Sequence, residues 1–168
     1  MSLTMHSASV TTFDNMLRAL IHVINKAKAH CEAKKINPEA LTTARLFPDM
    51  FPFWHQCCLV SDFAKGAVSR LAGVEVPSWA DDQRTFDELI ARLEKTRDYI
   101  KGFGPEKLEG ADAKPITLKI GGQDMTITGE QYLLNMATPN FYFHVTTAYN
   151  ILRKGGVEVG KRDFLGRA

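Results

Sequence analysis

The segment from Val10 to Ala33 carries the pattern that most constrains the fold. Its apolar side chains recur three and four positions apart, which is the spacing of one face of an α-helix. An amphipathic helix of this kind is stable only when another element covers its apolar face. The residues on that face are Phe13, Met16, Leu17, Leu20, Ile21, Ile24 and Cys31.

Three further stretches predict long helices. The second helix has Pro48 or Pro52 in its first turn, where a missing N–H costs nothing, and it stops at Gly73. The third begins at Thr85, because Thr85 and Glu88 have the Ser/Thr-x-x-Glu spacing of a capping box. The predicted ranges are about 52–72, 85–100 and 130–154.

The second predicted helix has two sides of different polarity. Gln56 shares a side with apolar residues, whereas His55 lies on the other, more polar side. The pattern therefore directs Gln56, rather than His55, toward the core. The polar side carries His55, Cys58, Asp62, Lys65 and Ser69.

A short β-hairpin is predicted before the last helix. Residues 115–128 alternate apolar and polar side chains around Gly121 and Gly122, a dipeptide that suits a tight turn. Four helices with one apolar face each pack best as a bundle. We therefore expect an all-α fold, a four-helix bundle with a hairpin, in a single domain over residues 1–168.

The composition limits the classes of partner. A formal net charge of +2 is too small to predict a nucleic-acid partner, and the chain has no apolar run of about 18 residues that would cross a membrane. The start of the sequence does not resemble a signal peptide, and three cysteines without metal-site spacing suit a reducing compartment. A cytoplasmic location is expected.

His144 is the main candidate for a site. It faces the same general direction as the apolar residues of the fourth helix, and Pro139 should open that helix about one turn earlier. The candidates for a ligand pocket are His144, Asn140, Gln56 and the neighbouring aromatic Tyr149. The alternative interpretation is a core histidine that is hydrogen-bonded to a neighbouring polar group.

A metal site requires more ligands than the pattern supplies. Catalytic zinc is typically held by about three protein ligands, usually imidazole or carboxylate. The sequence offers His144, with His55 as a second imidazole on another helix, as ligands for a divalent metal such as zinc or nickel.

Three stretches carry a resemblance to a known family. They are PDMFPFWHQ on the second helix, NFYFHVTTAYNILRKGGV on the fourth and GKRDFLG near the end. Together they resemble an uncharacterised bacterial family with only a domain-of-unknown-function label, which is similar to a branch of the DinB/YfiT-like superfamily of metalloenzymes. The resemblance covers nearly the whole chain and implies a DinB-like four-helix bundle with a hairpin before the last helix.

The resemblance also implies positions for metal ligands. In better-known members of the superfamily, a histidine from the second helix and an HxxxH pair on the fourth bind a divalent metal, and some branches activate thiols for transfer reactions. The second histidine of the pair corresponds to His144 and the first to Asn140. On the second helix the inward position falls near Gln56 or Leu59, with His55 one residue out of phase.

Three functions follow as expectations. The first choice is a bundle that binds a small ligand or a partner in a pocket near His144, without a complete metal triad. The alternative is a metal-dependent transferase or hydrolase of the DinB type. A third is an interaction protein that forms a homodimer through the hairpin and the C-terminal tail, whose apolar residues are Val157, Val159, Phe164 and Leu165.

Overall fold

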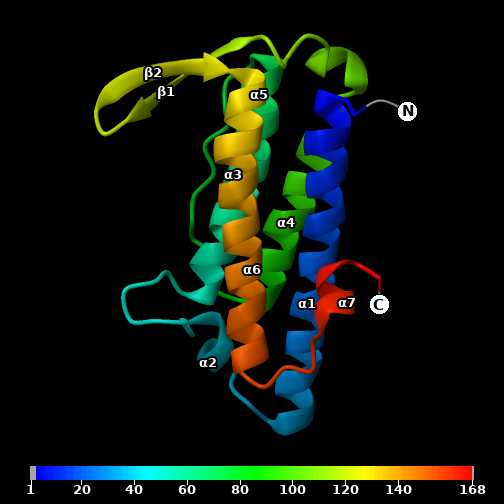
Figure 1. Ribbon diagram of the computed structural model, residues 1–168. Coiled ribbons are helices and arrows are strands. Elements are labelled where there is room, and N and C mark those ends of the chain that lie inside the picture. The colour runs from blue at the N-terminus through cyan, green and yellow to red at the C-terminus, as the bar shows by residue number, and fades with distance from the viewer. Residues whose placement is uncertain (1–2, 168) are drawn as a thin grey trace.

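Four long helices form the body of the protein in the computed structural model, which describes residues 3–167 (Figure 1). They are α1 (Thr12–Lys34), α3 (Phe53–Ala72), α4 (Phe86–Lys101) and α6 (Thr138–Lys154). The short helices α2 (Glu39–Thr42) and α7 (Lys161–Phe164) are additional to the four that the sequence predicts, whereas α5 (Gly129–Tyr132) is the first turn of the predicted fourth helix. The fold is mostly helical, with one antiparallel hairpin.

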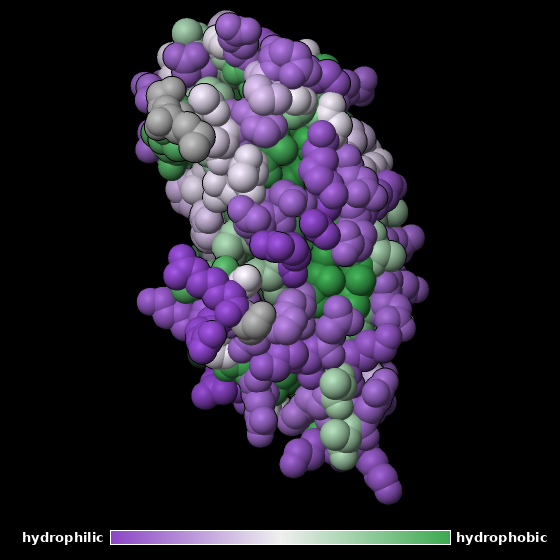
Figure 2. Space-filling view, turned by 90° about the vertical axis from the view of Figure 1, so that its right-hand side faces the viewer, coloured by the Kyte–Doolittle hydropathy of each residue, from purple (hydrophilic) through white to green (hydrophobic). Residues whose placement is uncertain are grey.

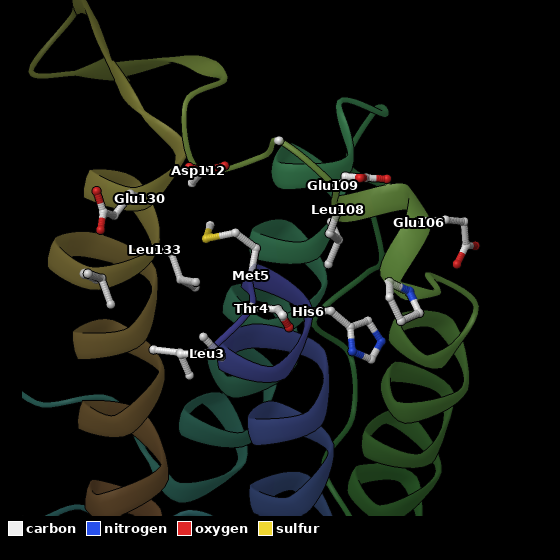
Figure 3. A pocket seen from close by; sticks show the side chains of 14 residues that line it. Leu3, Thr4, Met5, His6, Glu106, Leu108, Glu109, Asp112, Glu130 and Leu133 are labelled. Atoms are coloured by element: carbon white, nitrogen blue, oxygen red, sulfur yellow. The ribbon is translucent and has the colours of Figure 1, made fainter. Parts of the chain in front are cut away.

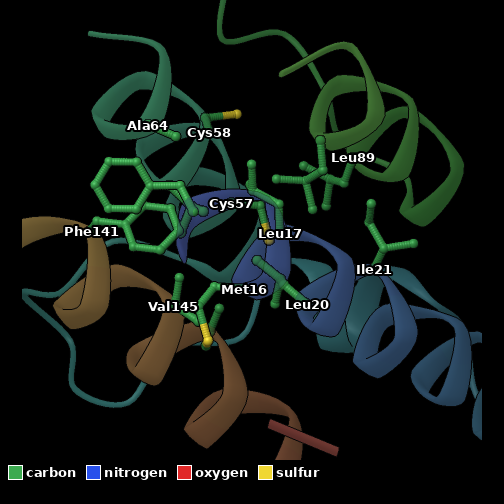
Figure 4. Packing of buried hydrophobic residues seen from close by; sticks show 14 of the residues in the cluster. Met16, Leu17, Leu20, Ile21, Cys57, Cys58, Ala64, Leu89, Phe141 and Val145 are labelled. Atoms are coloured by element: carbon green, nitrogen blue, oxygen red, sulfur yellow. The ribbon is translucent and has the colours of Figure 1, made fainter. Parts of the chain in front are cut away.

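The long helices close into a ring around one core. α3 packs against α4 and α6, and α1 packs against the same two helices, so each helix has two long neighbours. Figure 4 shows side chains of α1, α3, α4 and α6 meeting at the centre. Phe13, Phe53 and Phe141 are fully buried there. The predicted stripe on α1 is the part of this core that the first helix supplies.

The helix ends follow local chemistry. Thr85 and Glu88 form the predicted capping box at the start of α4, with Glu88 N donating to Thr85 Oγ1 at 3.3 Å and Thr85 N to Glu88 Oε2 at 2.9 Å. Gly73 ends α3 with φ +74°, in the left-handed region that glycine tolerates.

The last long helix is opened before His144. The predicted helix 130–154 is divided into α5, a π-helical turn at Leu133–Ala137 and α6. Pro139 has no N–H to donate to the carbonyl of Asn135, so the regular hydrogen-bond ladder is interrupted within this turn. The predicted opening is therefore present, although the helix axis continues through it (Figure 1).

One face of α3 differs from its prediction. Lys65 and Ser69, which the helical pattern places on the more polar side of α3, are buried against α4 and the segment 74–85. The Ser69 and Tyr99 hydroxyls lie 2.8 Å apart across the α3–α4 interface, whereas Lys65 Nζ pairs with Asp62 on α3 itself and lies 5.3 Å from the ring centroid of Trp79. The helix pattern alone was misleading because polar residues can be buried when they are paired.

The hairpin leaves the end of the bundle. β1 (Pro115–Ile120) pairs antiparallel with β2 (Gln123–Thr128), and Gly121 and Gly122 both have positive φ in the turn. Figure 1 shows the hairpin extending sideways from the bundle. Ile120 and Met125 near its tip are 43% and 40% exposed.

The surface on the side of α1 and α7 is largely polar. Figure 2 shows mainly hydrophilic residues on the side where α1 and α7 lie, with hydrophobic ones visible in the gaps between them. Within the described residues, no helix is both long and apolar enough to span a membrane.

Asp163 fixes the C-terminal segment to α1. Its carboxylate accepts a hydrogen bond from Gly160 N at 2.8 Å, and Lys26 Nζ and His22 Nε2 each lie 3.0 Å from its Oδ1. These contacts, led by the backbone bond from Gly160, lower the pKa of Asp163 from 3.8 to about 2. Val157 and Val159 of this segment are buried, whereas Leu165 is 42% exposed.

Removing the negative charge of Asp163 should destabilise the fold at neutral pH but not in strong acid. Because the folded pKa is depressed, the charge stabilises the fold above the ordinary pKa of 3.8, and this contribution is lost as the pH falls toward 2. Asp163→Asn is expected to lower the free energy of unfolding by about 1 to 2 kcal/mol at pH 7, since Lys26 and His22 are partly exposed. Urea unfolding across this pH range measures the difference, with Glu158→Gln in the same tail as control; an equal effect at pH 7 and near pH 2 contradicts the assignment.

Candidate functional site

His144 and Gln56 are joined across the α3–α6 interface. His144 Nδ1 lies 2.7 Å from Gln56 Oε1, and Gln56 Nε2 donates to the carbonyl of Phe51 at 3.1 Å. The second contact fixes the amide so that its oxygen faces the imidazole. Since that oxygen only accepts, Nδ1 carries the proton, and in the neutral ring Nε2 has the free lone pair.

Aromatic rings surround the imidazole. Phe63 stacks on it, with 5.3 Å between ring centroids and 17° between planes, and Phe143 meets it edge-on at 5.2 Å. Burial, followed by the charge of His55, lowers the pKa of His144 below 6.5. Both effects favour the neutral ring, the form in which Nε2 has a free lone pair.

Nε2 of His144 is the open position of this site. No described residue is hydrogen-bonded to it. Within the described chain, two fully enclosed side-chain atoms form no hydrogen bond, Arg92 Nε and the Asp81 Oδ1 that is ion-paired with Arg92, and Nε2 of His144 is not one of them. A lone pair that is free of protein partners and not sealed in can accept a proton or a hydrogen bond from a ligand.

His55 lies beside this pair but is directed elsewhere. Its ring is stacked on Trp54 at 4.8 Å and lies 4.2 Å from the ring of Phe51. Its Nε2 is 3.9 Å from a carboxylate oxygen of Asp81. Its position, one residue out of phase with Gln56, agrees with the sequence pattern.

Asn140 and Tyr149 lie away from the His144 and Gln56 pair. Asn140 was expected to face inward, but it is exposed, and its amide donates to the carbonyl of Met136 at 2.7 Å. Tyr149 packs on the C-terminal segment, where its hydroxyl donates to Val159 O at 3.4 Å. The structure therefore unites two of the four ligand-pocket candidates.

The donors do not fit a catalytic zinc or nickel centre. Such a centre takes about three imidazole, thiolate or carboxylate ligands, whereas the groups next to His144 are the amide of Gln56 and aromatic rings. Over residues 3–167, no three His, Cys, Asp or Glu side chains are placed to hold one ion. His144 shares one property with metal-binding histidines, since one of its ring nitrogens is fixed by a hydrogen bond.

A buried polar cluster between α3 and α4 was missed by the sequence analysis. Arg92 of α4 has a side chain only 3% exposed, and its Nη2 lies 2.9 Å from Asp62 and 2.8 Å from Asp81. Its Nη1 donates to Ala80 O at 2.6 Å and to Gln83 Oε1 at 2.7 Å. Arg92 thus attaches the segment before α4 to both helices.

A sequence signal for this cluster exists on each helix. Ser61, Lys65 and Ser69 recur at four-residue steps on α3, as do Arg92 and Thr96 on α4. Polar residues at this spacing form a stripe, and two such stripes can satisfy each other. The Ser61 and Thr96 hydroxyls are 2.7 Å apart in the buried interface.

Comparison with known proteins agrees with this architecture. Residues 5–165 match the model of the family described as "Domain of unknown function (DUF1993)". A crystal structure of a DinB family member from Shewanella denitrificans is similar, with a TM-score of 0.90 and 36% sequence identity over 95% of this chain and 90% of that one. No curated protein matches. The chain therefore belongs to the DUF1993 family, an uncharacterised family of DinB-like proteins.

Proposed function

We propose that the protein binds a small planar molecule at the surface around His144. Nε2 of His144 accepts a hydrogen bond that the bound molecule donates. The observation that carries this proposal is the contact between His144 Nδ1 and Gln56 Oε1. It orients the ring and selects the tautomer before any ligand arrives, so little ordering cost is left to binding. This function needs no resident metal.

The surrounding rings define the chemistry of the ligand. Phe143 borders the imidazole and is 56% exposed, so its ring is available to a ligand that reaches Nε2. Phe51, whose carbonyl holds Gln56, is 50% exposed. Aromatic side chains favour stacked or edge-on contact with planar groups. A planar compound with one hydrogen-bond donor therefore suits the site.

Phenol is a suitable probe, because it combines a ring with one O–H donor. We expect a phenol titration, followed by the ¹⁵N chemical shifts of the imidazole, to change the Nε2 signal of His144 and to leave Nδ1 protonated. Anisole, which has the ring but no donor, should bind at least several-fold more weakly. Phenol binding should be lost in His144→Phe and retained in the distant variant His30→Phe.

Two results would count against this site. Equal phenol affinity in wild type and His144→Phe shows that the imidazole is not the acceptor. A titration that moves Nδ1 rather than Nε2 shows that the Gln56 contact does not select the tautomer.

A metal-dependent transferase or hydrolase is the second candidate. The observation in its favour is that Nε2 of His144 is free and that a second imidazole, His55, is close by. His55 is near enough for its charge to lower the pKa of His144. Asn140→His places a second imidazole one helical turn away and is expected to raise zinc affinity at least tenfold, measured by calorimetry on protein without a histidine tag. If wild type already retains one equivalent of zinc after dialysis, the metal-dependent function replaces the first proposal.

Self-association is the third candidate function. For all three candidate functions we propose that the protein is located in the cytoplasm. The apolar tip of the hairpin, Ile120 and Met125, is available for contact with a second copy. Sedimentation equilibrium over a wide concentration range tests it, and a concentration-independent monomer excludes the dimer.

A further inference from the structure

A cavity lies at the end of the bundle where the hairpin leaves. Its volume is about 770 Å³, within the range of roughly 300 to 1,000 Å³ that is usual for small-molecule sites. It is formed by residues 3–8, by the 3-10 turn Pro105–Leu108 with the loop after it, and by residues 130–134 (Figure 3). Its lining includes neither His144 nor Gln56.

The floor of the cavity is apolar. In Figure 3 the side chains of Met5, Leu108 and Leu133 point toward its interior. Leu108 and Leu133 belong to the core, whereas Leu134 at the edge is 52% exposed. Covering this surface with an apolar group would remove it from water, at roughly 25 cal/mol per Å².

Two of the helical segments that line the cavity contain a π-helical turn. Ala8 belongs to the π-helical turn Ser7–Thr11, and Leu133 and Leu134 begin the π-helical turn Leu133–Ala137. Single π-helical turns inside helices are rare and are frequent at functional sites. The two turns face the same cavity from different ends of the chain.

The rim carries four carboxylates. Figure 3 shows Glu130, Asp112, Glu109 and Glu106 placed around the opening. Within residues 3–167, none of them forms an ion pair. Lys107 on the same turn is directed away, since its Nζ donates to Gly102 O at 2.7 Å. The rim is therefore negative on a chain with a net charge of +2.

The spacing of these carboxylates argues against a metal ion. A divalent ion needs ligands that converge on one point, and no three such groups within the described chain do so. A charge distributed around an opening instead suits a cation that is larger and carries its own apolar body.

The rim is held in place without a ligand. Gly129 N donates to Lys114 O at 2.8 Å, and Glu130 N donates to Asp112 O at 2.9 Å. The loop passes so close to α5 that a Cβ at Gly129 would lie 1.8 Å from Ala111 O. The backbones that carry Asp112 and Glu130 are thus fixed side by side.

We propose that this cavity binds an amphipathic organic cation, an alkylammonium compound whose charged head lies at the carboxylate rim and whose chain covers the apolar floor. The head gains from the negative field at the opening, and the chain gains from burial against Met5, Leu133 and Leu134. Neither gain is sufficient alone, so both parts of the ligand are required.

Three eight-carbon probes separate these contributions. We expect n-octylammonium to bind with one site per chain in calorimetry, n-octanol at least tenfold more weakly and n-octanoate more weakly still. Added salt should weaken octylammonium binding, because the rim is exposed to solvent.

A matched pair of variants tests the rim. The rim variant combines Glu106→Gln, Glu109→Gln, Asp112→Asn and Glu130→Gln, all at exposed positions. The control makes the same change in net charge at exposed positions elsewhere, with Asp49→Asn, Glu75→Gln, Asp124→Asn and Glu158→Gln. Octylammonium affinity should fall at least tenfold in the rim variant and less than twofold in the control.

Each contrary outcome overturns the proposal. Equal loss in both variants shows a response to net charge alone, and equal affinity for octanol shows that the charge is not recognised. Leu134→Gln, which alters the floor at a half-exposed position, should weaken octylammonium binding without unfolding the protein. Calcium chloride that displaces the probe stoichiometrically would assign the carboxylates to a metal instead.

Discussion

Phe141→Ala is expected to lower the free energy of unfolding by about 3 to 5 kcal/mol, the largest effect predicted for this chain. Phe141 is fully buried, and its ring centroid lies 4.5 Å from that of Phe13 on α1. Figure 4 shows it within the buried cluster, near Ala64 of α3. Truncation therefore removes apolar contacts from several helices and leaves a cavity that rigid helices cannot close.

The neighbouring Phe143 provides the control. It lies two residues further along α6 and is 56% exposed, so Phe143→Ala should change the free energy of unfolding by no more than about 0.5 kcal/mol. Urea unfolding followed by circular dichroism measures both variants. Similar losses for the two would show that α6 is not oriented as described. Phe143→Ala should nevertheless weaken phenol binding, which separates stability from the proposed function.

The second large effect is expected for Arg92→Ala, which should lower the free energy of unfolding by about 2 to 4 kcal/mol. The change leaves Asp62 and Asp81 without their shared cation and removes the donor to Ala80 O and Gln83 Oε1. A fully buried pair that loses one partner costs about 3 to 5 kcal/mol, and the lower estimate allows for carboxylates that are 31% and 35% exposed.

Lys101→Ala is the matched control for Arg92→Ala, because it removes a cation from an exposed ion pair on the same helix. Lys101 pairs with Asp98 at 3.4 Å on the exposed side of α4, where ion pairs contribute about 0 to 1 kcal/mol. Raising the salt concentration should diminish the small Lys101 effect and leave most of the Arg92 effect. If Arg92→Ala costs less than 1 kcal/mol, the cluster does not hold the segment before α4.

Local sequence patterns were sufficient for the helix ends and for the hairpin. Thr85 and Glu88 are three residues apart, and Gly121 and Gly122 are adjacent, so each device is complete within one short stretch. The same holds for Gln56, which lies on the buried side of α3 because its apolar neighbours set that side. Gln56 and His144 are 88 residues apart in the sequence. They lie close together because both face inward from packed helices.

Asn140 shows where the helical pattern ceased to be informative. A four-residue step rotates a side chain by about 40° around a helix. Because His144 lies at the edge of the buried face, with 9% exposure, that rotation is enough to bring Asn140 into solvent. The sequence could give the direction of His144 only approximately, and its edge position depends on how α3 and α6 pack.

The sequence by itself determined the four apolar faces, the hairpin and the inward direction of His144, because each depends on residues close together in the chain. Only the tertiary structure decided that Lys65 and Ser69 are buried, that Arg92 joins Asp62 to Asp81, and that three separate segments enclose a carboxylate-rimmed cavity. A buried polar group is stable only beside its partner. Those partners lie on other elements, so their pairing is fixed by helix packing and not by any single stretch of sequence.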